Sequence, residues 1–144
     1  MKPVKIGLIG AGRIGQLHGN NVAQRIKNAK LEAIAELYLN DDHKAWADSL
    51  GVTKVYNDPE QIFSDPEIDA VMICSSTDTH AEMIVKAAKA GKHIFCEKPI
   101  HYDLDVIREA IAEVDKAGVK FMTGFVRRFD HNHKKVHDTI ASGK

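Results

Sequence analysis

Val4-Lys5-Ile6-Gly7-Leu8-Ile9 is a short apolar run that leads directly into Gly10-Ala11-Gly12-Arg13-Ile14-Gly15. The first stretch is typical of a β-strand, and the second has the spacing G-x-G-x-x-G. A helical pattern follows at once, with an apolar face expected at Ile14, Leu17, Val22 and Ile26. The glycines therefore lie where a strand turns into a helix, which is the context of a dinucleotide-binding loop.

Each glycine of this loop has its own physical reason. Gly10 allows a tight turn, Gly12 lets the backbone approach a pyrophosphate, and Gly15 lets the helix pack closely on the strand. The phosphates would lie at the helix N-terminus, where unpaired N–H groups and the helix dipole favour an anion. The loop therefore predicts a bound dinucleotide.

Composition narrows the class of protein. A chain of 144 residues with 44% hydrophobic and 28% charged residues is typical of one folded domain. Its 20 basic and 20 acidic residues balance, so we expect no nucleic-acid or membrane partner. Cys74 and Cys96 each close an apolar run, as buried thiols do in a reducing compartment. With no signal peptide at the start and no apolar stretch of the roughly 20 residues that span a bilayer, we expect a cytoplasmic protein.

Strand and helix patterns alternate along the rest of the chain. Further strands are predicted at 31–36, 54–56, 69–74, 93–96 and 120–123. Helices are predicted at 42–50, from Asp58-Pro59 onward, and at 81–90, 103–117 and 130–141. This alternation predicts an α/β fold, a doubly wound parallel sheet of the Rossmann type with helices on both faces and the strand order 3-2-1-4-5-6. Ligands of such sheets lie outside the carboxyl ends of the strands.

Glu36 ends the second predicted strand, about 20 residues after the glycine loop. A carboxylate at this place accepts hydrogen bonds from the adenosine ribose hydroxyls and repels a 2′-phosphate. Arg13 is the opposing signal, because an arginine beside the loop could pair with that phosphate. The sequence favours NAD over NADP as cofactor.

Glu97-Lys98-Pro99 follows the fifth predicted strand. A lysine at a strand end can donate a hydrogen bond to a substrate hydroxyl and, where desolvated, take part in proton transfer. Pro99 restrains the backbone around it. The alternative is an ordinary exposed lysine in a turn.

The motifs together resemble the N-terminal half of the Gfo/Idh/MocA oxidoreductase family, and the chain looks most like its inositol dehydrogenases. The resemblance rests on the glycine loop, Asp69-Ala70-Val71, Thr77-Asp78-Thr79-His80, Ala90-Gly91-Lys92-His93, Glu97-Lys98-Pro99 and Gly124-Phe125-Val126-Arg127-Arg128-Phe129-Asp130. It implies an NAD(P)-dependent enzyme that oxidises a ring hydroxyl of a polyol or sugar to a ketone by hydride transfer. Many members carry proline at the position of Ser76 and aspartate at that of Glu36.

The resemblance also implies roles for single residues. Lys98 would be catalytic and lie between the nicotinamide and the substrate, and Arg127 would return toward the nicotinamide. The residues predicted to bind the cofactor are Gly10, Gly12, Arg13, Ile14, Gly15, Glu36, Ser75, Ser76, Thr77, His80, Glu97, Lys98 and Arg127. No metal site is predicted: His131, His133 and His137 have no accompanying glutamate and fit a solvated helix better.

Family enzymes are roughly twice as long as this chain. We therefore expect residues 1–124 to form the dinucleotide-binding domain and residues 125–144 to begin the connection to a substrate domain that this chain lacks. That second domain supplies an Asp and a His, so the chain alone should be inactive, and the complete enzyme should be a homo-oligomer. The alternative is a non-catalytic NAD-binding sensor or regulatory subunit.

Overall fold

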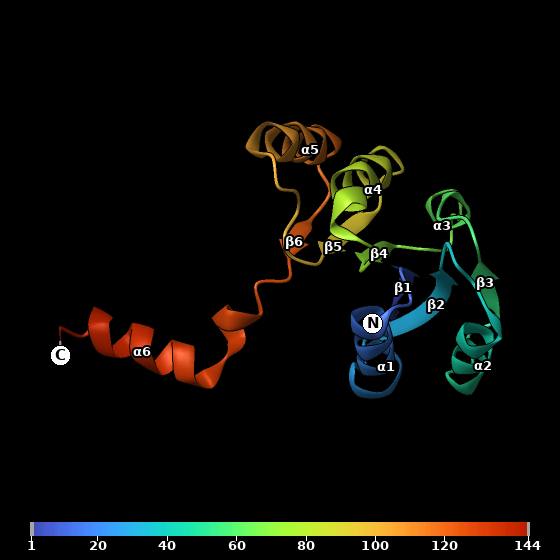
Figure 1. Cartoon of the computed structure of the whole chain (residues 1–144), viewed down its shortest axis with the longest axis horizontal. Coiled ribbons are helices and arrows are strands. Elements are labelled where there is room, and N and C mark those ends of the chain that lie inside the picture. The colour runs from blue at the N-terminus through green and yellow to red at the C-terminus, as the bar shows by residue number, and fades with distance from the viewer. Residues whose placement is uncertain (1, 144) are drawn as a thin grey trace.

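The fold is described from a computed structural model, in which residues 2–143 are placed. A six-stranded parallel sheet has the order β3-β2-β1-β4-β5-β6, as predicted (Figure 1). Its strands are β1 (Val4–Ile9), β2 (Ala29–Ala35), β3 (Lys54–Tyr56), β4 (Ala70–Ile73), β5 (His93–Cys96) and β6 (Phe121–Thr123). The Rossmann-type α/β fold is thereby confirmed.

The register of the strands places their carboxyl ends at one edge. Ile9 of β1 lies opposite Ala35 of β2 and Ile73 of β4, and Ile73 lies opposite Cys96 of β5. The residues that follow these strands therefore gather at the same edge of the sheet. This edge carries the site.

Helices cover both faces of the sheet (Figure 1). One face carries α1 (Arg13–Arg25) and α2 (Asp41–Ser49), and the other carries α3 (Glu60–Phe63), α4 (Thr77–Lys89) and α5 (Leu104–Ala117). Each face has its own apolar core. Leu8, Val22 and Ile34 belong to the first, and Ile62, Ile73, Ile84 and Val114 to the second.

The predicted apolar face of α1 is confirmed at Val22 and wrong at Ile14, Leu17 and Ile26. Its buried residues are Gly15, Gly19 and Val22, whereas the exposed apolar residues include Ile14, Leu17 and Ile26. A Cβ at Gly15 would lie 1.9 Å from the Gly10 carbonyl oxygen, and one at Gly19 would lie 2.8 Å from the Trp46 ring. Because α1 lies this close to the glycine loop and to Trp46 of α2, its smallest residues must lie at these contacts.

Helix α4 begins at Thr77, four residues before the predicted start at 81. The prediction missed this start because the first turn of α4 is polar and adds no apolar residue to the helical pattern. The predicted buried face is confirmed at Met83, Ile84, Ala87 and Ala88. The earlier start matters because it places the helix N-terminus at the carboxyl edge of the sheet. The other predicted boundaries lie within a few residues of the observed ones.

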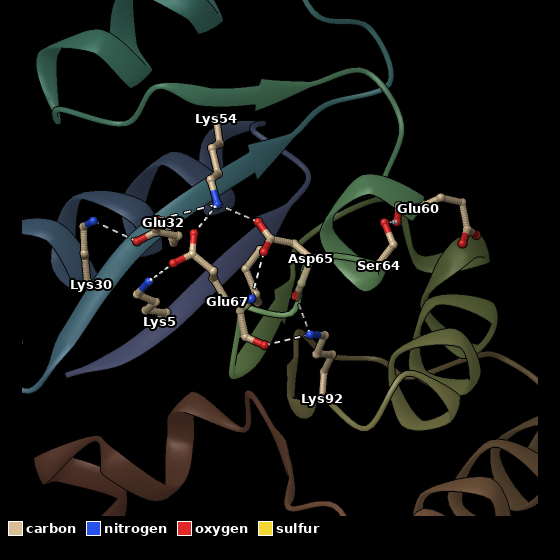
Figure 2. Close-up of polar contacts among 10 residues, drawn as sticks. Lys5, Lys30, Glu32, Lys54, Glu60, Ser64, Asp65, Glu67 and Lys92 are labelled. Atoms are coloured by element: carbon tan, nitrogen blue, oxygen red, sulfur yellow. Dashed lines mark hydrogen bonds and ion pairs between the residues drawn. The ribbon is translucent and has the colours of Figure 1, made fainter. Parts of the chain in front are cut away.

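An ion-pair cluster fixes the opposite edge of the sheet (Figure 2). Lys54 Nζ lies 2.7 Å from Asp65 Oδ2 and 3.0 Å from Glu67 Oε2. The buried Lys92 ammonium donates to the carbonyl oxygens of Asp65 and Ile68 at 2.6 and 2.8 Å. These contacts hold the segment between α3 and β4 at the amino ends of the strands, opposite to the carboxyl edge.

The last segment leaves the sheet. A 3-10 helix, η1 (Val126–Phe129), and α6 (His131–Ala141) project away from the α/β body (Figure 1). The predicted stripe of α6 is exposed, at 60% for Val136 and 70% for Ile140. Among residues 2–143, no helix combines the length and the apolar character that crossing a membrane requires.

Candidate functional site

A cleft of about 450 Å³ opens at the carboxyl ends of β1, β2 and β4. It brings together five residues of the predicted cofactor set: Gly10, Gly12, Glu36, Ser75 and Ser76. The cleft is also lined by residues that sequence reasoning missed, which include Leu37, Tyr38, Pro59, Thr79 and Met83. Leu37 and Tyr38 could have been found, because they directly follow Glu36 at the end of β2.

The glycine loop forms an open cradle at this cleft. Gly10 has φ +91°, and a Cβ there would lie 2.6 Å from the Ser75 backbone nitrogen, so both conformation and space require glycine. A Cβ at Gly12, in contrast, would meet no protein atom within 4 Å. The protein itself therefore needs no glycine at position 12, and the open space suits a ligand that touches the backbone.

Two helix N-termini face this edge without a side-chain cap. Within residues 2–143, no side chain hydrogen-bonds as a cap to the start of α1 after Gly12, or to the start of α4 after Ser76. The first turn of α1 contains no acidic residue and begins with Arg13. Free N–H groups and the positive end of the dipole make such a start an anion site, so a diphosphate fits the residues present.

Glu36 holds the loop and remains available to a ligand. Its Oε2 accepts a hydrogen bond from Ala11 N at 2.6 Å, and its Oε1 accepts one from Tyr38 N at 3.1 Å. A carboxylate has about four acceptor positions, so further hydrogen bonds from ribose hydroxyls are possible. Its negative charge disfavours a phosphate at the same place.

Lys98 lies in a second hollow of about 430 Å³, which is also lined by Phe125, Val126, Arg127 and Arg128. Lys98 and Arg127, both predicted site residues, thus line one hollow, although they are 29 positions apart in the sequence. The Lys98–Pro99 peptide bond is cis. Arg127 Nη1 lies 3.5 Å from Asp130 Oδ2.

Two residues of the predicted set, His80 and Glu97, are buried and belong to the lining of neither the cleft nor the hollow. The ring nitrogens of His80 lie 2.9 Å from the Ser75 carbonyl oxygen and 2.8 Å from that of Pro99. The residue Glu97 is 6% exposed, and its Oε1 lies 2.8 Å from His18 Nε2. The polar atoms of both side chains contact other residues of the protein, so these side chains support the loops beside the cleft.

The other members of the predicted set stand at helix starts. Arg13 and Ile14 lie exposed in the first turn of α1, and Gly15 packs against Gly10. Thr77 is the first residue of α4. None of these side chains lines the cleft within the described residues, so any contact of Arg13 with a cofactor stays a prediction.

Of the remaining reactive side chains, Cys74 lines the cleft, whereas Cys96, His133 and His137 are outside its lining. Burial raises the pKa of both Cys74 and Cys96 to about 12, which keeps the thiols protonated. His133 and His137 are exposed on α6 and contact Asp130 and Asp138. In the part of the chain that the structure describes, no three such side chains are grouped to hold a metal.

Comparison with known proteins yields consistent matches. The family model described as "Oxidoreductase family, NAD-binding Rossmann fold" matches residues 4–125. The chain is 44% identical over 140 residues to the myo-inositol 2-dehydrogenase of Thermotoga maritima, covering 97% of this chain and 41% of that protein. An uncharacterized oxidoreductase of Bacillus subtilis is 46% identical over 143 residues, with 99% and 41% covered.

A solved structure extends the match to the fold. Scyllo-inositol dehydrogenase from Lactobacillus casei, with bound cofactor NAD(H) and scyllo-inositol, aligns with a TM-score of 0.91 at 35% identity, covering 99% of this chain and 42% of that one. The chain thus spans about two fifths of the length of these relatives. The family match over residues 4–125 shows that the chain belongs to the Gfo/Idh/MocA oxidoreductase family, within its NAD-binding Rossmann domain.

Proposed function

We propose that this chain is the NAD-binding part of a dehydrogenase that oxidises a ring hydroxyl of an inositol-like polyol to a ketone. The observation that carries the proposal is the cleft at the carboxyl edge. There an open Gly12 cradle, uncapped starts of α1 and α4, and the Glu36 carboxylate face one cavity. The names of the relatives support the substrate class.

The residues of the chain divide the work of binding. Backbone N–H groups at the start of α1 would hold the pyrophosphate, and Glu36 would accept hydrogen bonds from the adenosine ribose. The exposed Leu37 and Tyr38 would lie beside the adenosine end of the cleft. The charge of Glu36 supports NAD over NADP, because among residues 2–143 no basic side chain lines the cleft to neutralise a 2′-phosphate; Arg13, beside the lining residue Gly12, is the opposing signal.

Lys98 is the residue that we propose for the chemistry. Bound NAD supplies a hydride acceptor at the nicotinamide. Lys98 would donate a hydrogen bond to the reacting oxygen of the substrate, and the proton of that hydroxyl would pass to the His of the second domain. Arg127 in the same hollow would help to keep the hollow positively charged. Lys98 is exposed and lines the hollow, so a substrate that enters the hollow from solvent can contact it.

We further propose that residues 125–144 begin the connection to a second domain. Exposed apolar side chains on η1 and α6, which include Phe129, Val136 and Ile140, support this reading. The second domain would complete the substrate site and assemble the enzyme as a homo-oligomer, so the 144-residue chain should bind NAD without turning over substrate. The buried thiols Cys74 and Cys96 support a cytoplasmic location.

Calorimetric titration of the chain with NADH and with NADPH tests the binding half of the proposal. We expect one site per chain and at least tenfold tighter binding of NADH. Absence of binding at millimolar NADH would reject the proposal, and tighter NADPH binding would reverse the cofactor preference. For the enzymatic half, a complete enzyme containing this domain should reduce NAD in the presence of myo- or scyllo-inositol, and Lys98→Met should lower kcat by about 100-fold or more.

A further inference from the structure

We propose that His18 and His80 are positioning residues that fix the Glu97-Lys98-Pro99 turn and connect it to the nucleotide-binding starts of α1 and α4. The inference rests on the proposed function and deepens it. It concerns how Lys98 is placed, and it assigns neither histidine a direct contact with substrate or cofactor.

The Lys98 side chain has no partner of its own. It is exposed, and within residues 2–143 its ammonium makes no hydrogen bond or ion pair. Its four-carbon stem is flexible, so nothing in the side chain itself directs it into the hollow. The direction of Lys98 must therefore come from the backbone of the turn that carries it.

His18 holds this turn on the side before Lys98. His18 Nε2 lies 2.8 Å from Glu97 Oε1, and the other carboxylate oxygen accepts a hydrogen bond from Lys98 N at 3.1 Å. The Glu97 carboxylate thus joins the helix side chain directly to the backbone of Lys98. The His18 ring also meets Phe95 edge-on, with the centroids 5.3 Å apart.

Gly124 closes the space around this carboxylate. A Cβ at Gly124 would lie 3.1 Å from Glu97 Oε1 and 3.1 Å from the Phe95 ring. The backbone that follows β6 therefore packs against Glu97 and Phe95, and the side chain of Glu97 is only 8% exposed. A buried carboxylate without its hydrogen-bonding partner is destabilised, so Glu97 depends on His18 to keep its place.

His80 holds the turn on the side after Lys98. Its ring nitrogens lie 2.8 Å from the Pro99 carbonyl oxygen and 2.9 Å from the Ser75 carbonyl oxygen, and the residue is 2% exposed. Both partners are carbonyl oxygens, so each nitrogen donates only where it carries a hydrogen: a ring with one N–H donates to one carbonyl and packs against the other, and a ring with two donates to both. One imidazole thereby bridges the cleft-lining Ser75 and the turn.

Both anchors come from helices that begin at the proposed pyrophosphate site. His18 lies five positions after Arg13, the first residue of α1, and His80 lies three positions after Thr77, the first residue of α4. A ligand that orders these helix starts also orders the two histidines. By linkage, contacts that fix the turn should in return strengthen nucleotide binding.

The test uses the 15N-labelled 144-residue chain and NADH. His18→Leu keeps the volume beside Phe95 but removes the ring nitrogens, whereas His18→Gln keeps an N–H donor near the carboxylate. His137→Leu is the matched control, because His137 is exposed on α6 and contacts only Asp138 among the described residues. For each variant we would record the Lys98 amide signal with and without NADH, and the NADH dissociation constant.

We expect H18L to shift the Lys98 amide signal, to abolish its response to NADH and to weaken NADH binding about fivefold or more. H18Q should restore both properties, H137L should leave both unchanged, and H80L should reproduce H18L. Should H80L fail to fold, His80→Gln, which keeps an N–H donor, is measured in its place, and a folded His80→Leu chain with a wild-type Lys98 response overturns the inference. A wild-type Lys98 response in H18L, or a failure of H18Q to restore it, overturns the inference while leaving the proposed function intact. A wild-type chain that binds no NADH rejects the proposed function, and the inference with it.

Discussion

Replacing Gly12 by alanine should separate ligand binding from folding. The Gly12 backbone has φ −68° and ψ −173°, which alanine adopts, and the new Cβ would meet no protein atom within 4 Å. Alanine is a poorer N-cap than glycine, but it also restricts the unfolded chain, and these effects oppose each other. The free energy of unfolding should therefore change by less than about 0.5 kcal/mol, and Tm by less than about 2 °C.

The same methyl group should impair NADH binding. It occupies the open space over the loop, and it keeps a pyrophosphate from the backbone amides at the start of α1. A hydrogen bond to a charged group contributes about 1.5–3 kcal/mol, so the loss of one such bond weakens binding by about 10- to 150-fold. Isothermal titration gives the affinity, and thermal unfolding without ligand gives the stability.

Gly15→Ala is the matched comparison. Its Cβ would lie 1.9 Å from the Gly10 carbonyl oxygen, against a limit of about 3.0 Å for real Cβ contacts, so α1 must move away from β1. Overpacking of this kind costs about 1–3 kcal/mol. G15A should therefore lose both stability and binding. Unchanged NADH affinity in G12A, or a loss of stability in G12A equal to that in G15A, would refute the reasoning.

Three further predictions follow from other parts of the structure. Glu36→Gln keeps an acceptor for Ala11 N but removes the charge, so NADH affinity should fall about fivefold while NADPH affinity rises; titrations with both nucleotides check this, and an equal change for both would contradict it. Lys92→Met removes the ammonium donor from the buried Ile68 carbonyl, whereas the half-buried Asp65 carbonyl still accepts from Ile68 N, and it should lower the free energy of unfolding by about 1.5–3 kcal/mol, with NADH affinity within twofold of wild type. Urea unfolding measures this effect, and a change below about 0.5 kcal/mol would count against the proposed role of Lys92. Hydrogen bonds from Lys5 and Lys54 lower the pKa of Glu67 from 4.5 to about 2, so its stabilising effect is complete above pH 4.5 and is lost as the pH falls toward 2. The urea midpoint should therefore fall across this range and fall less steeply in Lys54→Met; parallel curves for the two proteins would exclude the cluster as the cause.

The sheet could be predicted from sequence because few rules determine it. Short apolar runs alternate with helical patterns, and right-handed crossovers then fix the strand order. The same rules bring Gly10, Glu36 and Ser75 to one edge, where the structure has them. Lys98 and Arg127 were paired by resemblance to a family, not by periodicity, and the structure places both in one hollow.

What sequence reasoning missed depends on packing between distant segments. The exposed Ile14 and Leu17 were assigned to the core because apolar periodicity cannot show that α1 approaches the sheet through its glycines. The contact between His18 and Glu97 joins residues 79 positions apart, and neither residue type is usually buried. Only the close approach of α1 to the end of β5 reveals it.

A crystal structure of the 144-residue chain with bound NADH would test the central claim most directly. The account predicts the pyrophosphate within hydrogen-bonding distance of the backbone amides between Gly12 and Gly15, the adenosine ribose on Glu36, and the nicotinamide on the side of Lys98. A nucleotide bound away from the glycine loop, or a nicotinamide on the sheet edge opposite to Lys98, would contradict it.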